Sequence, residues 1–137
     1  MGNRVVKFRG KRVDNGEWVV GYYWSNDLGN HFIRQIIDGE YNYVCTDYEV
    51  DPEIVGQYTG LKDKNGVEIC EGDIVTAHAQ AYRAIGEVRS RIDGLWLLYP
   101  AYQHGKLWGL SPNPKGQTKV EVIGNIHDNP ELLKNAL

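Results

Sequence analysis

The sequence is poor in the residue types that build disulfide frameworks, metal centres and membrane spans. Its 137 residues include only two cysteines, Cys45 and Cys70, whose spacing fits neither a zinc motif nor a disulfide framework. No apolar run approaches the roughly 20 residues that cross a bilayer, and the N-terminus lacks the hydrophobic stretch of a signal peptide. We therefore expect a reduced, cytoplasmic protein with no membrane partner.

Positive charge is also scarce. The chain carries 15 basic and 18 acidic residues, a net charge of −3, whereas nucleic-acid-binding domains are usually strongly basic. The distribution of the basic residues weakens this argument against nucleic-acid binding, because five of them fall within the first twelve positions: Arg4, Lys7, Arg9, Lys11 and Arg12. Single strands are bound by positive charge together with stacking rings. Weak nucleic-acid binding through this basic strand and the aromatic residues after it is therefore the alternative function.

Motifs for catalysis and phosphate binding are missing. No serine lies in a Gly-x-Ser-x-Gly elbow, and the Gly56-x-x-x-Gly60 segment lacks the Gly-Lys-Ser/Thr ending of a phosphate loop. The histidines have no i,i+4 pairing and no neighbouring cysteine, whereas a zinc site needs three or four convergent ligands. We predict no catalytic, cofactor-binding or metal-binding residues and no enzymatic activity.

One acidic pattern leaves two interpretations open. Carboxylates recur at every second position in Asp47, Glu49, Asp51 and Glu53, so an extended backbone places them on one face. Such a row provides oxygen ligands for a divalent cation or forms a solvated strand edge that resists aggregation. We favour the solvated edge, because calcium loops wrap around their ion and a straight strand does not.

The abundant features are turn signals and strand formers. Asn15-Gly16 and Asn65-Gly66 predict type I′ hairpin turns, in which both central residues take positive φ. The spacing of these and other turns predicts an N-terminal antiparallel β meander over residues 1–49 and a C-terminal β region over residues 50–137. Pro100–Thr118 is predicted as a long loop, and Pro130–Ala136 as the one short C-terminal helix.

Several segments together resemble a known family. They are FRGK at 8–11, GEWV at 16–19, VDPE at 50–53, VGQYTGLKDKNG at 55–66, EGDIV at 71–75, VIGNI at 122–126 and NPELL at 129–133. This pattern is similar to that of the YopX-like phage and prophage proteins, although Ile54 and Cys70 replace an expected threonine and aromatic residue. The resemblance covers nearly the whole chain. It implies a mainly β fold with an SH3-like small barrel in residues 50–137, and it implies no established activity.

The expected function is therefore that of a phage-derived, non-enzymatic binding or assembly module in the host cytoplasm. Its partner is a second copy of the chain or another phage or host protein. Exposed strand edges and aromatic side chains favour self-association into a homo-oligomer. The predicted protein-contact residues are Trp18, Tyr22, Trp24, Tyr102 and Trp108.

Overall fold

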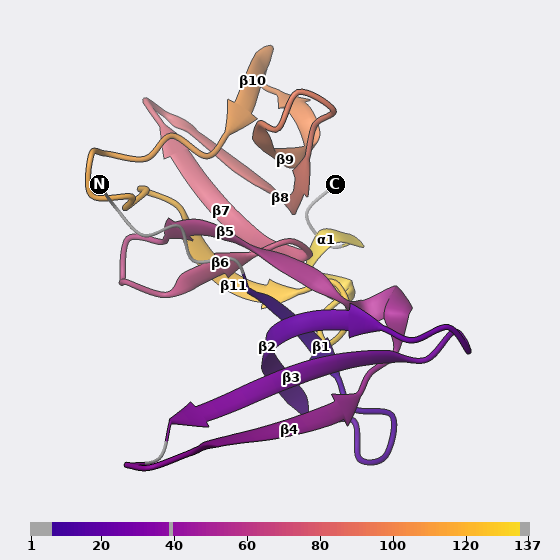
Figure 1. Cartoon of the computed structure of the whole chain (residues 1–137). Coiled ribbons are helices and arrows are strands. Elements are labelled where there is room, and N and C mark those ends of the chain that lie inside the picture. The colour runs from indigo at the N-terminus through magenta and orange to yellow at the C-terminus, as the bar shows by residue number, and fades with distance from the viewer. Residues whose placement is uncertain (1–6, 39, 135–137) are drawn as a thin grey trace. The chain divides into compact units, whose positions relative to one another are not determined.

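The computed structural model describes residues 7–38 and 40–134 and is built almost entirely of β-strands (Figure 1). The chain divides into two compact units, Met1–Tyr58 and Thr59–Leu137. Both are antiparallel β structures, and one short helix lies near the C-terminus. The predicted mainly β class is confirmed. Within the described residues, no helix is long and apolar enough to span a membrane.

Unit 1 is an antiparallel meander to which the start of β5 adds a strand beside β1. Its elements are β1 (Phe8–Lys11), β2 (Trp18–Ser25), β3 (His31–Asp38), β4 (Tyr43–Glu49), η1 (Pro52–Ile54) and β5 (Gly56–Lys62). The strand order is β4-β3-β2-β1-β5. At Gly21 the backbone of β3 lies very close to that of β2. A Cβ on Gly21 would sit 2.3 Å from the carbonyl oxygen of Arg34, so only glycine fits at this position.

The core of unit 1 is small. Val19, Ile33 and Val50 are buried, and Phe8 and Tyr23 pack against them. These positions alternate with outward-facing residues along each strand, as a half-buried sheet requires. One face of the sheet is therefore committed to the core, and the other is left at the surface.

Unit 2 contains the end of β5 and all the later strands of the described chain. They are β6 (Glu68–Cys70), β7 (Asp73–Ala79), β8 (Tyr82–Ser90), β9 (Trp96–Gln103), β10 (Lys106–Gly109) and β11 (Glu121–Asn125). Strand β6 neighbours β5, and the other five form a sheet in the order β10-β9-β8-β7-β11. Its two edge strands do not pair with each other in the described chain. The predicted closure into an SH3-like barrel is therefore not confirmed.

The segment predicted as a long loop is partly ordered as a hairpin. Strand β9 continues through Gln103, a tight turn follows at His104-Gly105, and β10 pairs back with β9. Both turn residues have positive φ, as a type I′ turn requires. His-Gly serves here in place of the usual Asn-Gly, which is why the turn signal was missed. The predicted terminal helix is present as α1 (Glu131–Lys134), and positions 135 and 136 of the predicted range lie outside the described residues.

The turn at Asn65-Gly66 differs from the predicted type I′. Gly66 has a φ of 86° but Asn65 is not in the positive-φ region, and at Asn15-Gly16 likewise only the glycine has positive φ. The loop instead closes on Asp63, whose backbone N–H donates to the Val67 carbonyl at 2.8 Å and whose own carbonyl accepts from Gly66 at 3.0 Å. The Asp63 carboxylate also accepts from the N–H groups of Asn65 and Val67, at 2.8 and 2.9 Å. An aspartate two residues before the Asn-Gly pair thus selects the turn type.

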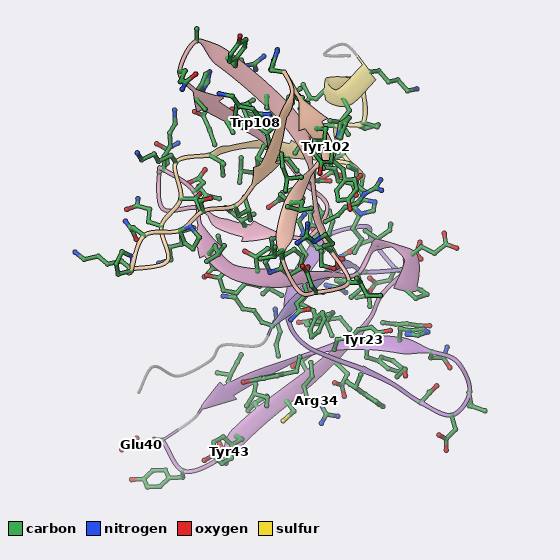
Figure 2. The ribbon with its side chains drawn as sticks, turned by 90° about the horizontal axis from the view of Figure 1, so that it is seen from above. Tyr23, Arg34, Glu40, Tyr43, Tyr102 and Trp108 are labelled. Carbon is green, nitrogen blue, oxygen red and sulfur yellow. The ribbon has the colours of Figure 1, made fainter. Side chains whose placement is uncertain are left out.

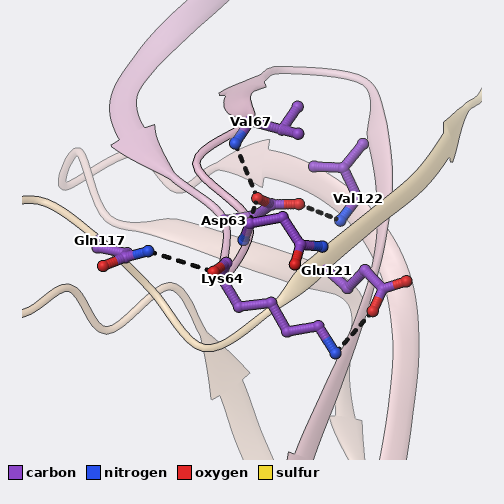
Figure 3. A network of polar contacts seen from close by, with 7 residues as sticks. Asp63, Lys64, Val67, Gln117, Glu121 and Val122 are labelled. Atoms are coloured by element: carbon purple, nitrogen blue, oxygen red, sulfur yellow. Dashed lines mark hydrogen bonds and ion pairs between the residues drawn. The ribbon is translucent and has the colours of Figure 1, made fainter.

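Asp63 also joins this loop to β11 (Figure 3). Its side chain is fully buried, and its second oxygen accepts from the backbone N–H of Val122 at 3.0 Å. The carboxylate therefore satisfies three backbone donors from two segments about sixty residues apart in sequence. A buried charge is tolerated only when it is bonded in this way.

Replacing Asp63 by alanine is expected to destabilise unit 2 strongly. The substitution leaves buried N–H groups without acceptors, and each such group costs about 1–3 kcal/mol. We expect Asp63→Ala to lower the free energy of unfolding by about 3 kcal/mol or more, measured by urea denaturation. Asn113→Ala is the matched control, because Asn113 makes the same two side-chain bonds in an exposed loop, to Lys115 and Gln117. Equal losses in the two variants would contradict a special role for Asp63.

Candidate functional site

The outer half of the β3–β4 hairpin extends beyond the rest of unit 1 as a two-stranded ribbon (Figure 1). Strand β2 pairs with β3 only from His31 to Arg34. The following residues of β3 pair only with β4, in a ladder that runs from Gln35↔Thr46 to Asp38↔Tyr43. We call residues 35–38 and 43–46 the arm; Figure 2 shows Tyr43 near its far end.

The arm exposes apolar side chains on both of its faces. Ile36 and Ile37 are 47% and 62% exposed, and Tyr43 and Val44 are 74% and 52% exposed. Successive residues of a strand point to opposite faces, so neither face is covered. An isolated two-stranded hairpin is only marginally stable in water. Apolar residues on both sides are therefore typical of a segment that another surface covers.

A compact polar and aromatic cluster lies at the base of the arm. Arg34 forms two hydrogen bonds with the Asp47 carboxylate, at 2.8 and 3.1 Å. The Trp24 indole N–H donates to the same carboxylate at 3.0 Å, and the Trp24 ring stacks on Phe32 with centroids 4.6 Å apart. The Arg34 hydrogen bond, assisted by that of Trp24, lowers the pKa of Asp47, and Asp47 raises the pKa of Arg34. Both groups therefore stay charged at neutral pH.

The basic residues at and just before β1 lie on the outward face of the unit 1 sheet. Lys7, Arg9 and Lys11 occupy alternate positions and thus share one side of the strand. Arg9 and Lys11 both lie over the Trp18 ring, at 4.8 and 5.2 Å from its centroid, and Lys7 lies 4.8 Å from that of Tyr58. The structure therefore brings three of the five predicted nucleic-acid contacts together with aromatic rings.

The two remaining basic residues are placed differently. Arg12 follows Lys11 directly and so points to the other side, where it lies over the Tyr48 ring and forms an ion pair with Asp14 at 2.6 Å. The Asp14 hydrogen bond raises the pKa of Arg12. Arg4 lies outside the described residues. The basic surface is therefore narrower than the sequence suggested.

The predicted protein-contact residues separate into surface and core. Trp18, Tyr22 and Trp24 are an even number of residues apart on β2 and share its outward face, where Tyr22 is 58% exposed. Tyr102 is 74% exposed on β9 (Figure 2). Trp108 differs from the prediction that it is a protein-contact residue. Its ring is only 7% exposed within the core of unit 2, and its indole N–H donates to the Gln103 carbonyl at 2.8 Å. A side chain buried to this degree belongs to the core of unit 2 and does not form an exposed aromatic anchor.

The sequence interpretation missed the apolar side chains of the arm. Ile36-Ile37 and Tyr43-Val44 fall within the predicted N-terminal meander, and that prediction does not indicate which neighbours cover them. Two adjacent apolar residues on each side of a hairpin turn place apolar groups on both faces. That pattern was the available signal, because an edge hairpin of a small meander has no second layer to cover both faces.

Three carboxylates of the predicted row form an ion pair or hydrogen bonds with nearby groups. Asp47 bonds to Arg34, Glu49 accepts from the Asn30 amide at 2.9 Å, and Asp51 caps the 3₁₀ turn by accepting from the Glu53 N–H. Across the described residues, no group of three or more His, Cys, Asp or Glu side chains is arranged to hold a metal ion.

The pKa of Asp47 provides a direct test of the cluster at the base of the arm. Arg34→Gln is expected to raise this pKa toward the ordinary value for aspartate, and Trp24→Phe to raise it by less, because Arg34 is the larger cause. The contribution of the pair to stability is present at neutral pH and is lost as the pH falls through the lowered pKa of Asp47. An NMR titration of the Asp47 carboxyl carbon measures both shifts. Identical titration curves in the wild type and Arg34→Gln would contradict the assignment.

Comparison with known proteins gives a family and a fold. The profile of a family described as YopX protein matches residues 7–134. The crystal structure of protein EF1440 from Enterococcus faecalis is 26% identical, covers 96% of this chain and 99% of its own, and aligns with a TM-score of 0.52. No curated protein matches the chain. The similarity to EF1440 supports the observed fold, and that name states no activity.

Proposed function

The chain belongs to the YopX family, and we propose that it is a non-enzymatic, self-associating assembly module of phage or prophage origin that acts in the host cytoplasm. The observation that supports this most directly is the arm, with exposed apolar side chains on both faces. Burying an aliphatic side chain completely contributes about 1.5–3 kcal/mol. Covering the half-exposed side chains of the arm would therefore contribute several kcal/mol to association.

A second copy of the chain is the partner that fits the arm. Strand β4 is an edge of the sheet, and charged side chains normally protect such edges from pairing. In β4 the charges lie at the base, in Asp47 and Glu49, whereas the outer residues Tyr43–Thr46 are uncharged. A twofold antiparallel pairing of Tyr43–Thr46 with its counterpart places no like charges opposite each other. This pairing extends the β3–β4 ladder into the second copy and at the same time covers apolar surface of the arm.

Polar substitution of the arm is expected to weaken self-association. Ile37 and Val44 are cross-strand partners, and threonine keeps their β-branched shape while removing apolar surface. We expect the wild type to exceed monomer size at micromolar concentration in light scattering. The Ile37→Thr/Val44→Thr double variant should raise the dissociation constant about tenfold or more, the equivalent of about 1.4 kcal/mol.

The control for this experiment is Ile92→Thr. Ile92 is fully exposed in the turn between β8 and β9, so the same chemical change is made away from the arm. A strictly monomeric wild type would contradict the proposal, and so would an equal effect of Ile92→Thr.

Weak binding of single-stranded nucleic acid is a second candidate function. The observation that favours it is the outward face of β1 and β2, where Arg9 and Lys11 lie over the Trp18 ring and Tyr22 is exposed nearby on the same strand as Trp18. Cations combined with aromatic rings are typical of surfaces that hold single strands. The net charge of −3 makes this the weaker candidate.

Point substitutions test this candidate better than truncation does, because removing residues 1–12 also removes β1, which pairs with both β2 and β5. We expect an Arg9→Gln/Lys11→Gln variant to lose affinity for a labelled oligothymidylate in low-salt anisotropy measurements. The magnitude of its salt slope should fall by about 1.4, roughly 0.7 for each phosphate contact on a single strand. Lys115→Gln, which removes one exposed charge from unit 2, should leave both unchanged. No wild-type binding at low salt would exclude the candidate.

A further inference from the structure

Half of one edge of β7 is left open in unit 2. Strand β11 pairs only with the first residues of β7, and this pairing ends at Glu121↔Thr76. Strand β8 covers the other side of β7 as far as Ala79↔Tyr82. On the β11 side, no strand within the described residues pairs with Ala77–Ala79. A sheet edge of this kind is a template for an additional strand.

The edge is open because the chain before β11 bonds elsewhere. The Thr118 N–H donates to the Lys62 carbonyl at 2.7 Å, and the Lys62 N–H donates to Gly116 at 2.9 Å. The Lys64 N–H donates to the Val120 carbonyl, also at 2.9 Å. Residues 116–120 are thus held against the 62–64 segment and diverge from β7. The gap is a consequence of the backbone bonding and does not depend on a mobile loop.

A hollow of about 300 Å³ lies beside this open edge. The buried side chains Ala77, Trp108 and Val120 line its apolar part. The exposed residues His78, Ser111 and Lys119 contribute its polar part. Among the described residues, neither His78 nor Lys119 has a side-chain hydrogen bond or an ion pair. The site therefore combines an apolar floor with polar groups that are available to a ligand.

The charge around the hollow contrasts with that of the whole chain. A second hollow, of about 410 Å³, shares Ser111, Thr118 and Lys119 with the first and extends to Lys64 and Gln117. No acidic residue is among the described residues that line either hollow, although acidic residues outnumber basic ones in the sequence, 18 to 15. Lys64 is already paired with Glu121 at 2.7 Å, so within the described chain the groups of the lining that an acidic ligand meets without a partner are Lys119 and His78.

We propose that the open edge of β7 binds an extended acidic peptide of another protein as an added strand. Addition of a strand to a sheet edge is a common mode of peptide recognition, in which backbone bonds provide affinity and side-chain pockets provide specificity. Ala77 faces the core and the next residue, His78, faces solvent. The peptide must therefore alternate, with apolar side chains toward Trp108 and acidic side chains on the side of His78 and Lys119.

This site and the arm belong to different units, so the two proposals can fail separately. The probe is a fluorescein-labelled hexapeptide that alternates glutamate and leucine, compared with the same peptide carrying lysine in place of glutamate. We expect the acidic peptide to bind with a dissociation constant on the order of 100 μM in anisotropy measurements. Amide shifts in an NMR titration should be centred on Ala77–Ala79. The lysine peptide should not bind.

Two charge reversals locate the binding site. Lys119→Glu should weaken binding of the acidic peptide about fivefold or more, because it places a carboxylate beside the ligand. Lys115→Glu is the matched control: Lys115 is exposed in the same segment and lines neither hollow, so its reversal should change the affinity by less than about twofold. The absence of saturable binding up to about 1 mM, or equal effects of the two reversals, would overturn the proposal. Displacement by free glutamate at the same carboxylate concentration would also overturn it, because it would indicate a simple anion site.

Discussion

The hydrogen bonds of the buried Asp63 carboxylate organise unit 2. One carboxylate oxygen accepts from the Val67 N–H and holds the 63–67 loop closed, and the other accepts from the N–H of Val122 in β11 at 3.0 Å. This arrangement places the backbone of Lys62 and Lys64 where it bonds to residues 116–120. Those residues are consequently not available to β7, and the open edge with its adjacent hollow results. A single satisfied charge therefore fixes both the path of the chain and the surface that the path exposes.

The sequence predicted the elements of the fold better than their connections. Glycine turns and β-branched runs predicted the N-terminal meander, because hairpins are determined by local residues. The turn at Asn65-Gly66 was predicted in the right place but with the wrong type, since the preceding Asp63 captures its N–H groups. The bond to Val122 depends on a residue 59 positions away, and no local pattern signals it. The open edge of β7 follows from such distant bonds and was not predictable.

The surface was harder to predict from the sequence than the fold. Tyr102 and Trp108 lie six residues apart in one aromatic segment, yet the first is 74% exposed and the second 7%. The hairpin turn at His104-Gly105 separates them, and that turn carries an unusual residue pair. The alternation of Lys7, Arg9 and Lys11 at and just before β1, in contrast, is enough by itself to place the three side chains on one face of an extended chain. A periodic pattern thus shows which residues lie together, and only tertiary packing shows which face is covered.

The shifted pKa values of the described residues bear on the kind of function that the surface supports. Each shift has the hydrogen bond of an ion pair as its largest cause. It lowers the pKa of the aspartates Asp14, Asp47 and Asp93, the last to about 2, and raises that of their arginine partners and of Arg89, which pairs with Glu87. Every such shift keeps its group charged at neutral pH. Groups fixed in one charge state suit recognition, because their charge and geometry do not vary. The Arg34–Asp47 pair lies at the base of the arm, so a fixed pair of charges borders the apolar surface that the proposed self-association would cover.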